Sequence, residues 1–207
     1  MQPWPGNVAP CTLDVPWPSW HSAGVEPPPT SQPAYQPFYC EENIWLLAQD
    51  PRCGAGERLV ALITGAAGHV AMWRQKPAEA PGEPLLWDYH VVLLVRDTAW
   101  RVWDFECDLG MPVAAGTWLA ACFPHQERIP ARYRPRFRVM PAHDYVATLR
   151  SDRSHMRDDD GAYAKPPPPW QPPGAGAGSN LVQFVDLDQT FVGDVLDLPA
   201  LQRRLEP

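Results

Sequence analysis

Two neighbouring stretches of this sequence decide its fold: LLWDYHVVLLV, residues 85–95, and WRVWDFE, residues 100–106. Both are rich in aromatic and β-branched residues, which favour strands. Only the four residues from Arg96 to Ala99 separate them. The pair therefore predicts an antiparallel hairpin.

Shorter segments on both sides of this hairpin complete an α+β pattern. Apolar residues at helical spacing predict a helix over residues 41–49, and Pro141 opens a second helix that reaches Leu149. Further strands are expected over residues 58–64, 69–73 and 137–140, a late strand or extended run over 180–186, and a terminal helix over 195–205 whose start Pro199 delays. This order favours an α+β fold with helices packed on one face of an antiparallel sheet.

The composition suits one folded domain with long tails or loops. Of the 207 residues, 45% are hydrophobic and 20% are charged, which is enough for a core and unlike a wholly disordered chain. The chain also has 27 prolines and 10 tryptophans. Because proline removes backbone donors and interrupts helices and strands, a mostly helical bundle or an uninterrupted sheet protein is disfavoured.

Ten of the prolines lie in the first 37 residues, which contain two acidic residues and no Lys or Arg. Such a composition favours an extended or disordered segment, and a docking segment for a proline-reading partner is the alternative. We therefore expect a proline-rich N-terminal tail over residues 1–34 and a single folded domain over residues 35–207. A second proline block, residues 166–173, is followed by Gly and Ala and predicts a spacer.

The net charge of −7 argues against a general nucleic-acid binder or a polybasic membrane-surface protein. No segment approaches the roughly 18 consecutive apolar residues that span a bilayer, and the first residues do not resemble a secretory signal. The cysteines are odd in number, scattered and without a C-x-x-C pair, which disfavours a disulfide framework or a zinc site. They are Cys11, Cys40, Cys53, Cys107 and Cys122. We expect free thiols in the cytoplasm, or also in the nucleus of a eukaryotic cell.

Cys40 is the thiol best placed for chemistry, because it lies at the start of the expected helix over residues 41–49. Free N–H groups and the positive end of the helix dipole stabilise a thiolate there, and the thiolate is the nucleophile. The negative charges of Glu41 and Glu42 act in the opposite direction. A buried, inert cysteine is the alternative. The presence of a partner base would distinguish a nucleophilic cysteine from an inert one.

His90 interrupts an otherwise apolar strand and shares one of its faces with Asp88. Burying such groups unpaired costs about 1–3 kcal/mol each, so His90 is either a hydrogen-bonded core histidine or an imidazole held for proton transfer. If the hairpin pairs Leu94 with Trp100, His90 falls opposite Asp104 on the same face, with Cβ atoms roughly 5 Å apart. A one-residue slip would separate them. A thiol, a base and an orienting carboxylate make a catalytic triad.

Three blocks resemble the protein N-terminal glutamine amidohydrolases in order and approximate spacing. They are FYCEENIW at residues 38–45, LWDYHVVLL at 86–94 and SDRSHM at 151–156, followed by the proline–tryptophan block at 166–170. The resemblance covers about residues 35–205. The first 34 residues have no counterpart in the core of that family.

The resemblance implies a monomeric cysteine amidohydrolase with a transglutaminase- or papain-like arrangement and the triad Cys40, His90 and Asp104. Such an enzyme converts an N-terminal glutamine of a polypeptide to glutamate through a thioester and releases ammonia. In eukaryotic relatives this step feeds the arginylation branch of the N-degron pathway. The expected partners are polypeptides with an N-terminal glutamine, without nucleic acid or membrane, and no metal or cofactor is needed.

Selecting an N-terminal glutamine requires recognition of its free α-amine, because a site built for a polar group rejects substrates that lack it. Asp88 and Asp152 are the acidic candidates for this role. A turn or capping role is the alternative for Asp152, and pairing with a neighbouring strand is the alternative for Asp88. Arg153 and His155 are expected to be structural links.

Two other classes of function stay open on the residues alone. A transglutaminase-like or papain-like acyl transferase or protease would use the same triad. A non-catalytic interaction protein would depend on the Pro- and Trp-rich segments. Trp45, Trp87 and Trp103 are expected to wall a cleft, because they lie close in sequence to the triad residues.

Overall fold

A computed structural model describes residues 32–206 of the chain, and all of them belong to one unit that begins at Gln32. The prediction of a proline-rich tail therefore lies outside the described residues, except for its last three. Among the described helices, none combines the length and the apolar character needed to cross a membrane.

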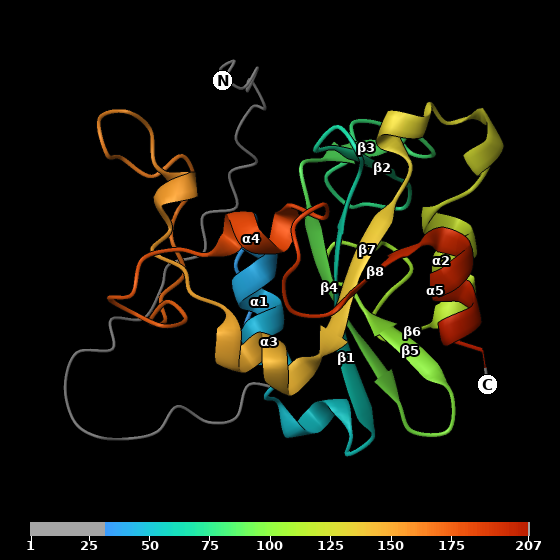
Figure 1. Ribbon diagram of the computed structural model, residues 1–207, viewed down its shortest axis with the longest axis horizontal. Helices are drawn as coiled ribbons and strands as arrows, with labels where there is room; N and C mark the ends of the chain where they lie inside the picture. Colours follow the sequence, from blue (N-terminus) through green and yellow to red (C-terminus); the bar gives the residue numbers. More distant parts are fainter. Residues whose placement is uncertain (1–31, 207) are drawn as a thin grey trace. The chain divides into compact units, whose positions relative to one another are not determined.

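A six-stranded antiparallel sheet forms the centre of the described unit (Figure 1). Its order is β6-β5-β4-β1-β7-β8. The bounds are β1 (Glu57–Thr64), β4 (His90–Arg96), β5 (Trp100–Trp103), β6 (Val113–Ala114), β7 (Arg136–Pro141) and β8 (Asp194–Asp197). The two central strands, β1 and β4, are buried along nearly their whole length, because both faces of the sheet are covered.

Helices cover both faces of this sheet, so the prediction of helices on one face was wrong. On one face lie α1 (Cys40–Leu47), α3 (Ala142–Thr148) and α4 (Leu181–Val185); on the other lie α2 (Ala115–Cys122) and α5 (Leu198–Arg204) (Figure 1). Side chains alternate along β4, so Val91 and Leu93 join the first layer and Val92 and Leu94 the second. The α+β class is confirmed.

The hairpin of β4 and β5 forms in a register two residues from the predicted one. Arg96 pairs with Trp100 and Leu94 with Val102, whereas Leu94 was expected to pair with Trp100. The strand β4 continues to Arg96 and leaves a tighter turn. Because side chains repeat every two residues, this shift keeps every residue on its predicted face.

Three other segments differ from the sequence prediction. The run over residues 85–95 is broken at Asp88, because β3 (Leu85–Trp87) leaves the main sheet and pairs with β2 (Val70–Met72) in a separate two-stranded sheet. Residues 180–186 contain helix α4 and no strand, since Leu181 and Phe184 are buried at a helical spacing of three and Val182 is exposed.

The predicted terminal helix over residues 195–205 is divided between β8 and α5. Asp197 accepts a hydrogen bond from Ala200 N at 2.8 Å and caps α5, so the helix begins at Leu198 and the preceding residues pair with β7. The remaining short 3₁₀ turns are η1 (Pro51–Cys53), η2 (Gln126–Arg128), η3 (Ala131–Tyr133) and η4 (Ser154–Met156).

Candidate active site

The start of α1 lies against the start of β4, and this junction brings Cys40 and His90 into one region. Cys40 is the first residue of α1, and α1 packs on β4 through Ile44 and Leu47. The backbone of Val91, the residue that follows His90, is close enough to the Cys40 thiol to lower its pKa. The predicted helix over residues 41–49 therefore exists and ends two residues earlier.

His90 and Asp104 form a buried hydrogen bond. The distance from His90 Nε2 to Asp104 Oδ1 is 2.8 Å, and each side chain is 1% exposed. Asp104 lies one residue beyond the end of β5. The prediction placed it directly opposite His90, and the observed register does not. The contact is diagonal across the hairpin, which a two-residue shift still allows.

Asp104 is fixed by further donors. Its Oδ1 also accepts from Glu106 N at 3.0 Å, and its Oδ2 accepts from Trp118 Nε1 at 3.0 Å. Trp87 stacks on the imidazole of His90, with ring centroids 5.2 Å apart and an interplanar angle of 15°. The carboxylate and the ring therefore have little freedom to turn.

The other ring nitrogen, His90 Nδ1, is buried without a hydrogen-bond partner among the described residues. Since Nε2 is engaged with Asp104, Nδ1 is the nitrogen open to a reacting group. An orphaned buried polar atom of this kind is rare in a folded protein and is characteristic of functional sites.

The charges of the pair shift both pKa values. Burial alone would lower the pKa of His90, but the charge of Asp104 and its hydrogen bond raise it above the usual value for histidine. Burial alone would raise the pKa of Asp104, but His90, Trp118 and the backbone of Glu106 bring it below the usual value. The pairing therefore stabilises the imidazolium that forms whenever His90 accepts a proton, and it keeps the carboxylate ionised.

The environment of Cys40 differs from the simple expectation for a helix start. Burial raises the pKa of the Cys40 thiol, and the nearby charges of Glu41 and Asp88 raise it further; the Val91 backbone opposes them. Burial, which the sequence does not show, is the largest cause, and the acidic neighbours act in the same direction. Cys40 is therefore a neutral thiol in the free protein and needs a base.

Two adjacent glutamates, Glu41 and Glu42, are both completely buried in the first turn of α1. Glu42 pairs with Arg153, with Nε to Oε1 at 2.9 Å and Nη2 to Oε2 at 2.8 Å, and Trp170 Nε1 donates to Oε2 at 2.9 Å. Arg153 also donates to the carbonyls of Pro168 and Trp170. The expected role of Arg153 as a structural link is confirmed.

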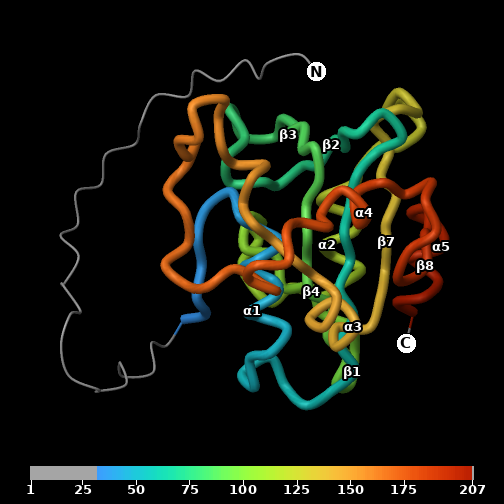
Figure 2. Tube along the Cα trace, turned by 60° about the vertical axis from the view of Figure 1, so that its left-hand side comes forward, coloured from blue at the N-terminus to red at the C-terminus, as the bar shows by residue number. Residues whose placement is uncertain are grey.

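This arginine holds the segment over residues 150–170 against the first turn of α1 (Figure 2). The hydroxyl of Tyr39, the residue before α1, donates to Lys165 O of the same segment at 3.2 Å. Glu41 faces the adjacent part of this loop, since its Oε1 lies 3.4 Å from His155 Nε2.

The two acidic candidates for amine recognition are placed differently. Asp88 is exposed, accepts from Tyr89 N at 2.8 Å and is close enough to influence both Cys40 and His155. Asp152 is exposed and accepts from Ser154 N, two residues along the chain, at 2.9 Å, which is a local turn contact. The structure therefore brings Asp88 to the site and gives Asp152 a local turn contact.

Several residues of the site were not identified from the sequence. Trp118 lies on α2, and Glu106 receives a hydrogen bond of 2.5 Å from Tyr35, which stacks on Phe105. Of the expected tryptophan walls, Trp87 contacts His90, whereas Trp45 packs under α3 by donating to Val146 O. Their closeness in sequence to the triad could have identified some of these residues: Glu106, for example, is a polar residue only two positions after Asp104.

One group of possible metal ligands occurs within residues 32–206: Asp104, Cys107 and Cys122, whose ligand atoms lie within 4.8 Å of one another. Both oxygens of Asp104 already accept hydrogen bonds from the protein. The four cysteines of the described region are free thiols.

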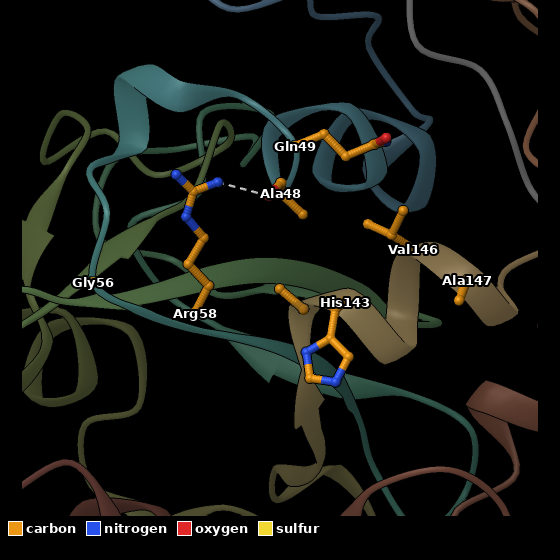
Figure 3. A pocket seen from close by; sticks show the side chains of 8 residues that line it. Ala48, Gln49, Gly56, Arg58, His143, Val146 and Ala147 are labelled. Atoms are coloured by element: carbon orange, nitrogen blue, oxygen red, sulfur yellow. Dashed lines mark hydrogen bonds between the residues drawn. The ribbon is translucent and has the colours of Figure 1, made fainter.

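A separate pocket of about 430 Å³ lies at the opposite end of α1 (Figure 3). Ala48, Gln49 and Arg58 line it together with residues of α3, and Arg58 donates to Ala48 O. It contains none of the residues of the site described above.

Comparisons with known proteins agree on one family. The family model described as N-terminal glutamine amidase matches residues 35–205. A protein N-terminal glutamine amidohydrolase of Caenorhabditis briggsae is 34% identical over 161 residues, which are 76% of this chain and 86% of the relative. Proteins of the same name from Bos taurus and Homo sapiens are each 32% identical, over 86% and 78% of this chain and 89% and 82% of their own lengths.

Proposed function

The chain belongs to the N-terminal glutamine amidase family, and we propose that it acts on that substrate class through Cys40, His90 and Asp104. The reaction is hydrolysis of the side-chain amide of an N-terminal glutamine, which gives glutamate and ammonia. The observation that carries the assignment of residues is the buried pair of His90 and Asp104, with Nδ1 of His90 left open on the side away from the carboxylate.

In the first half of the reaction, the sulfur of Cys40 forms a bond to the amide carbon of the glutamine side chain. The thiol proton passes to His90 Nδ1, because a neutral thiol needs a base before it can attack. The same proton then passes to the departing nitrogen, which leaves as ammonia when the carbon–nitrogen bond breaks. A thioester between the substrate and Cys40 remains.

In the second half, water takes the place of the amine. His90 accepts a proton from the water molecule, whose oxygen attacks the thioester carbon. The carbon–sulfur bond breaks and the proton returns to the sulfur, so the enzyme regains its starting state; the product is a carboxylic acid, which releases its own proton to the solvent to become the carboxylate.

Asp104 acts on both steps through His90. A carboxylate that holds Nε2 leaves Nδ1 as the working nitrogen and stabilises the imidazolium that forms in each half-reaction. Trp118 and the backbone of Glu106 hold the carboxylate in turn. The free N–H groups at the start of α1 are the proposed donors to the negative oxygen of the tetrahedral intermediates.

Further expectations complete the proposal. The order of nucleophile, base and carboxylate is that of a transglutaminase-like enzyme, which acts here as a monomer on free polypeptides and without nucleic acid or membrane. The unpaired cysteines of the described region agree with a reducing cytoplasmic environment. Light scattering over a range of concentrations tests the monomer, since a dimer would raise the mass with concentration.

A panel of peptides tests the activity. We expect ammonia release from a Gln-initiated peptide and little from peptides that begin with asparagine or acetyl-glutamine, or that carry an internal glutamine. The peptide chain should stay intact and uncrosslinked, which separates an amidohydrolase from a protease or a transferase. If the enzyme mainly cleaves or cross-links the peptides and does not release ammonia by hydrolysis, the assignment is rejected.

A further inference from the structure

Glu41 has an open carboxylate oxygen in the interior of the site. The residue is 0% exposed. Its Oε2 accepts a hydrogen bond from Tyr89 Oη at 3.0 Å and lies 3.8 Å from Cys40 Sγ. Its Oε1 has no hydrogen-bond partner among the described residues, although His155 Nε2 lies 3.4 Å away.

The neighbouring Glu42 shows what a satisfied carboxylate looks like in the same surroundings. Both of its oxygens receive hydrogen bonds, from the fork of Arg153 and from Trp170. A buried carboxylate oxygen without donors is energetically costly, so most buried polar groups are paired. Within residues 32–206, Oε1 of Glu41 faces only the imidazole of His155, at 3.4 Å and without the hydrogen bonds that hold Glu42, so it has room for a stronger cationic donor.

We propose that Glu41 recognises the α-ammonium group of the N-terminal glutamine and so restricts the enzyme to unblocked N-termini. The inference rests on the proposed function and identifies the amine-binding residue of that same site. The ligand is a primary ammonium group, which brings both the positive charge and the donors that Oε1 lacks.

The dimensions of glutamine fit this placement. Four single bonds connect the α-nitrogen of glutamine to its side-chain amide carbon, so the two atoms are at most about 5 Å apart. The carboxylate of Glu41 is adjacent to the attacking sulfur, with 3.8 Å from Oε2 to Sγ. One glutamine residue can therefore place its amide carbon at Cys40 and its ammonium at Glu41.

The charges around Cys40 give this recognition a second consequence. Glu41, Asp88 and Glu106 all act against ionisation of the thiol in the free protein. An ammonium bound at Glu41 offsets this negative potential close to the sulfur, which favours loss of the thiol proton. A blocked N-terminus lacks the charge and loses both the contact and the activation.

His155 and Asp88 frame the approach to Glu41. His155 is 26% exposed and its Nε2 lies 3.4 Å from Oε1; burial alone would lower the pKa of His155, but Glu41 raises it. The ammonium takes over this interaction. Asp88 is exposed and influences both Cys40 and His155. Asp88 therefore adds negative potential on the exposed side of the site, while Glu41 makes the direct contact with the ammonium group.

The test compares two peptides that differ only in the α-amine: a Gln-initiated peptide and the same peptide with the α-amino group of that glutamine replaced by hydrogen. Wild-type protein should favour the first by about 100-fold or more in kcat/KM, since a site built for a polar group rejects an analogue without it. In Glu41→Gln the ratio of the two kcat/KM values should fall to within a few-fold of one, chiefly because kcat/KM for the Gln-initiated peptide decreases.

Glu42→Gln is the matched control, because it removes an adjacent buried charge that is already paired. It should lower the melting temperature and keep the wild-type preference between the two peptides. Glu41→Asp keeps the charge but withdraws it by one methylene group, so its preference should stay above tenfold and fall below that of the wild type. It serves as the test if Glu41→Gln does not fold. Asp88→Asn should reduce the preference far less than Glu41→Gln.

The outcomes separate the two proposals. Wild-type protein that releases no ammonia from the Gln-initiated peptide overturns the proposed function and this inference together. Wild-type activity with an undiminished preference in folded Glu41→Gln, or in folded Glu41→Asp, overturns the inference alone.

Discussion

Replacement of Asp104 by asparagine should leave a folded protein with very low activity. The carboxylate accepts three hydrogen bonds, two at Oδ1 and one at Oδ2. An amide that keeps its oxygen toward His90 and Glu106 N places its NH₂ group against the N–H of Trp118. Two buried donors then face each other, which costs about 1–3 kcal/mol of stability.

The loss of activity should be larger than the loss of stability. Without the negative charge, the imidazolium formed in each half-reaction is no longer stabilised, and we expect kcat to fall by roughly 10²- to 10⁴-fold. The pH profile should shift as well. His90 must be neutral to accept a proton, so activity is lost as the pH falls through the pKa of His90, which Asp104 raises above the usual value of about 6.5. In the variant this acidic limb should move to lower pH.

Initial rates of ammonia release from a Gln-initiated peptide, measured from acidic to neutral pH, test both effects, and thermal melting measures the stability. Trp118→Phe is the control, because it removes one donor to Asp104 and keeps the charge. It should lose some stability and keep the acidic limb in place. Asp104→Asn activity within threefold of wild type, with an unshifted limb, would refute the role given to this carboxylate.

Other substitutions test the surroundings of the site. Arg153→Met should destabilise the protein by about 3–5 kcal/mol in urea unfolding, since it leaves Glu42 buried without its cation; a loss below 1 kcal/mol would contradict the pairing. Arg138→Met should cost a few kcal/mol, because the buried guanidinium donates to four backbone carbonyls that would lose their donor; unchanged melting would count against this. A chain without residues 1–31 should keep its ammonia-releasing activity, as all groups of the proposed mechanism lie within residues 32–206, and an inactive but folded product would favour a role for that segment.

The face that His90 and Asp104 share was predictable from the sequence, but their contact was not. Alternation along a strand assigns faces without knowledge of the register. The register depends on the turn after Arg96, and it moved by two residues. Because the shift was by an even number of residues, His90 and Asp104 stayed on the same face of the hairpin. Their contact is diagonal and not directly across the strands.

Helix α2 of the second helical layer was not predictable by the same means. Helix α2 begins without a side-chain cap and consists largely of small residues around Trp118, so it gives little periodic signal. The burial of Glu41 and Glu42 was equally hidden. Their partners Arg153 and His155 lie more than 100 residues later in the chain, and only the folded structure brings them to α1.

The most direct test of the proposed mechanism is capture of the thioester. Wild-type protein mixed with a Gln-initiated peptide and quenched in acid should show, by mass spectrometry, the mass of the peptide less ammonia attached at Cys40. Cys40→Ala should show no adduct and release no ammonia above background. Ammonia release by Cys40→Ala at the wild-type rate would contradict the account.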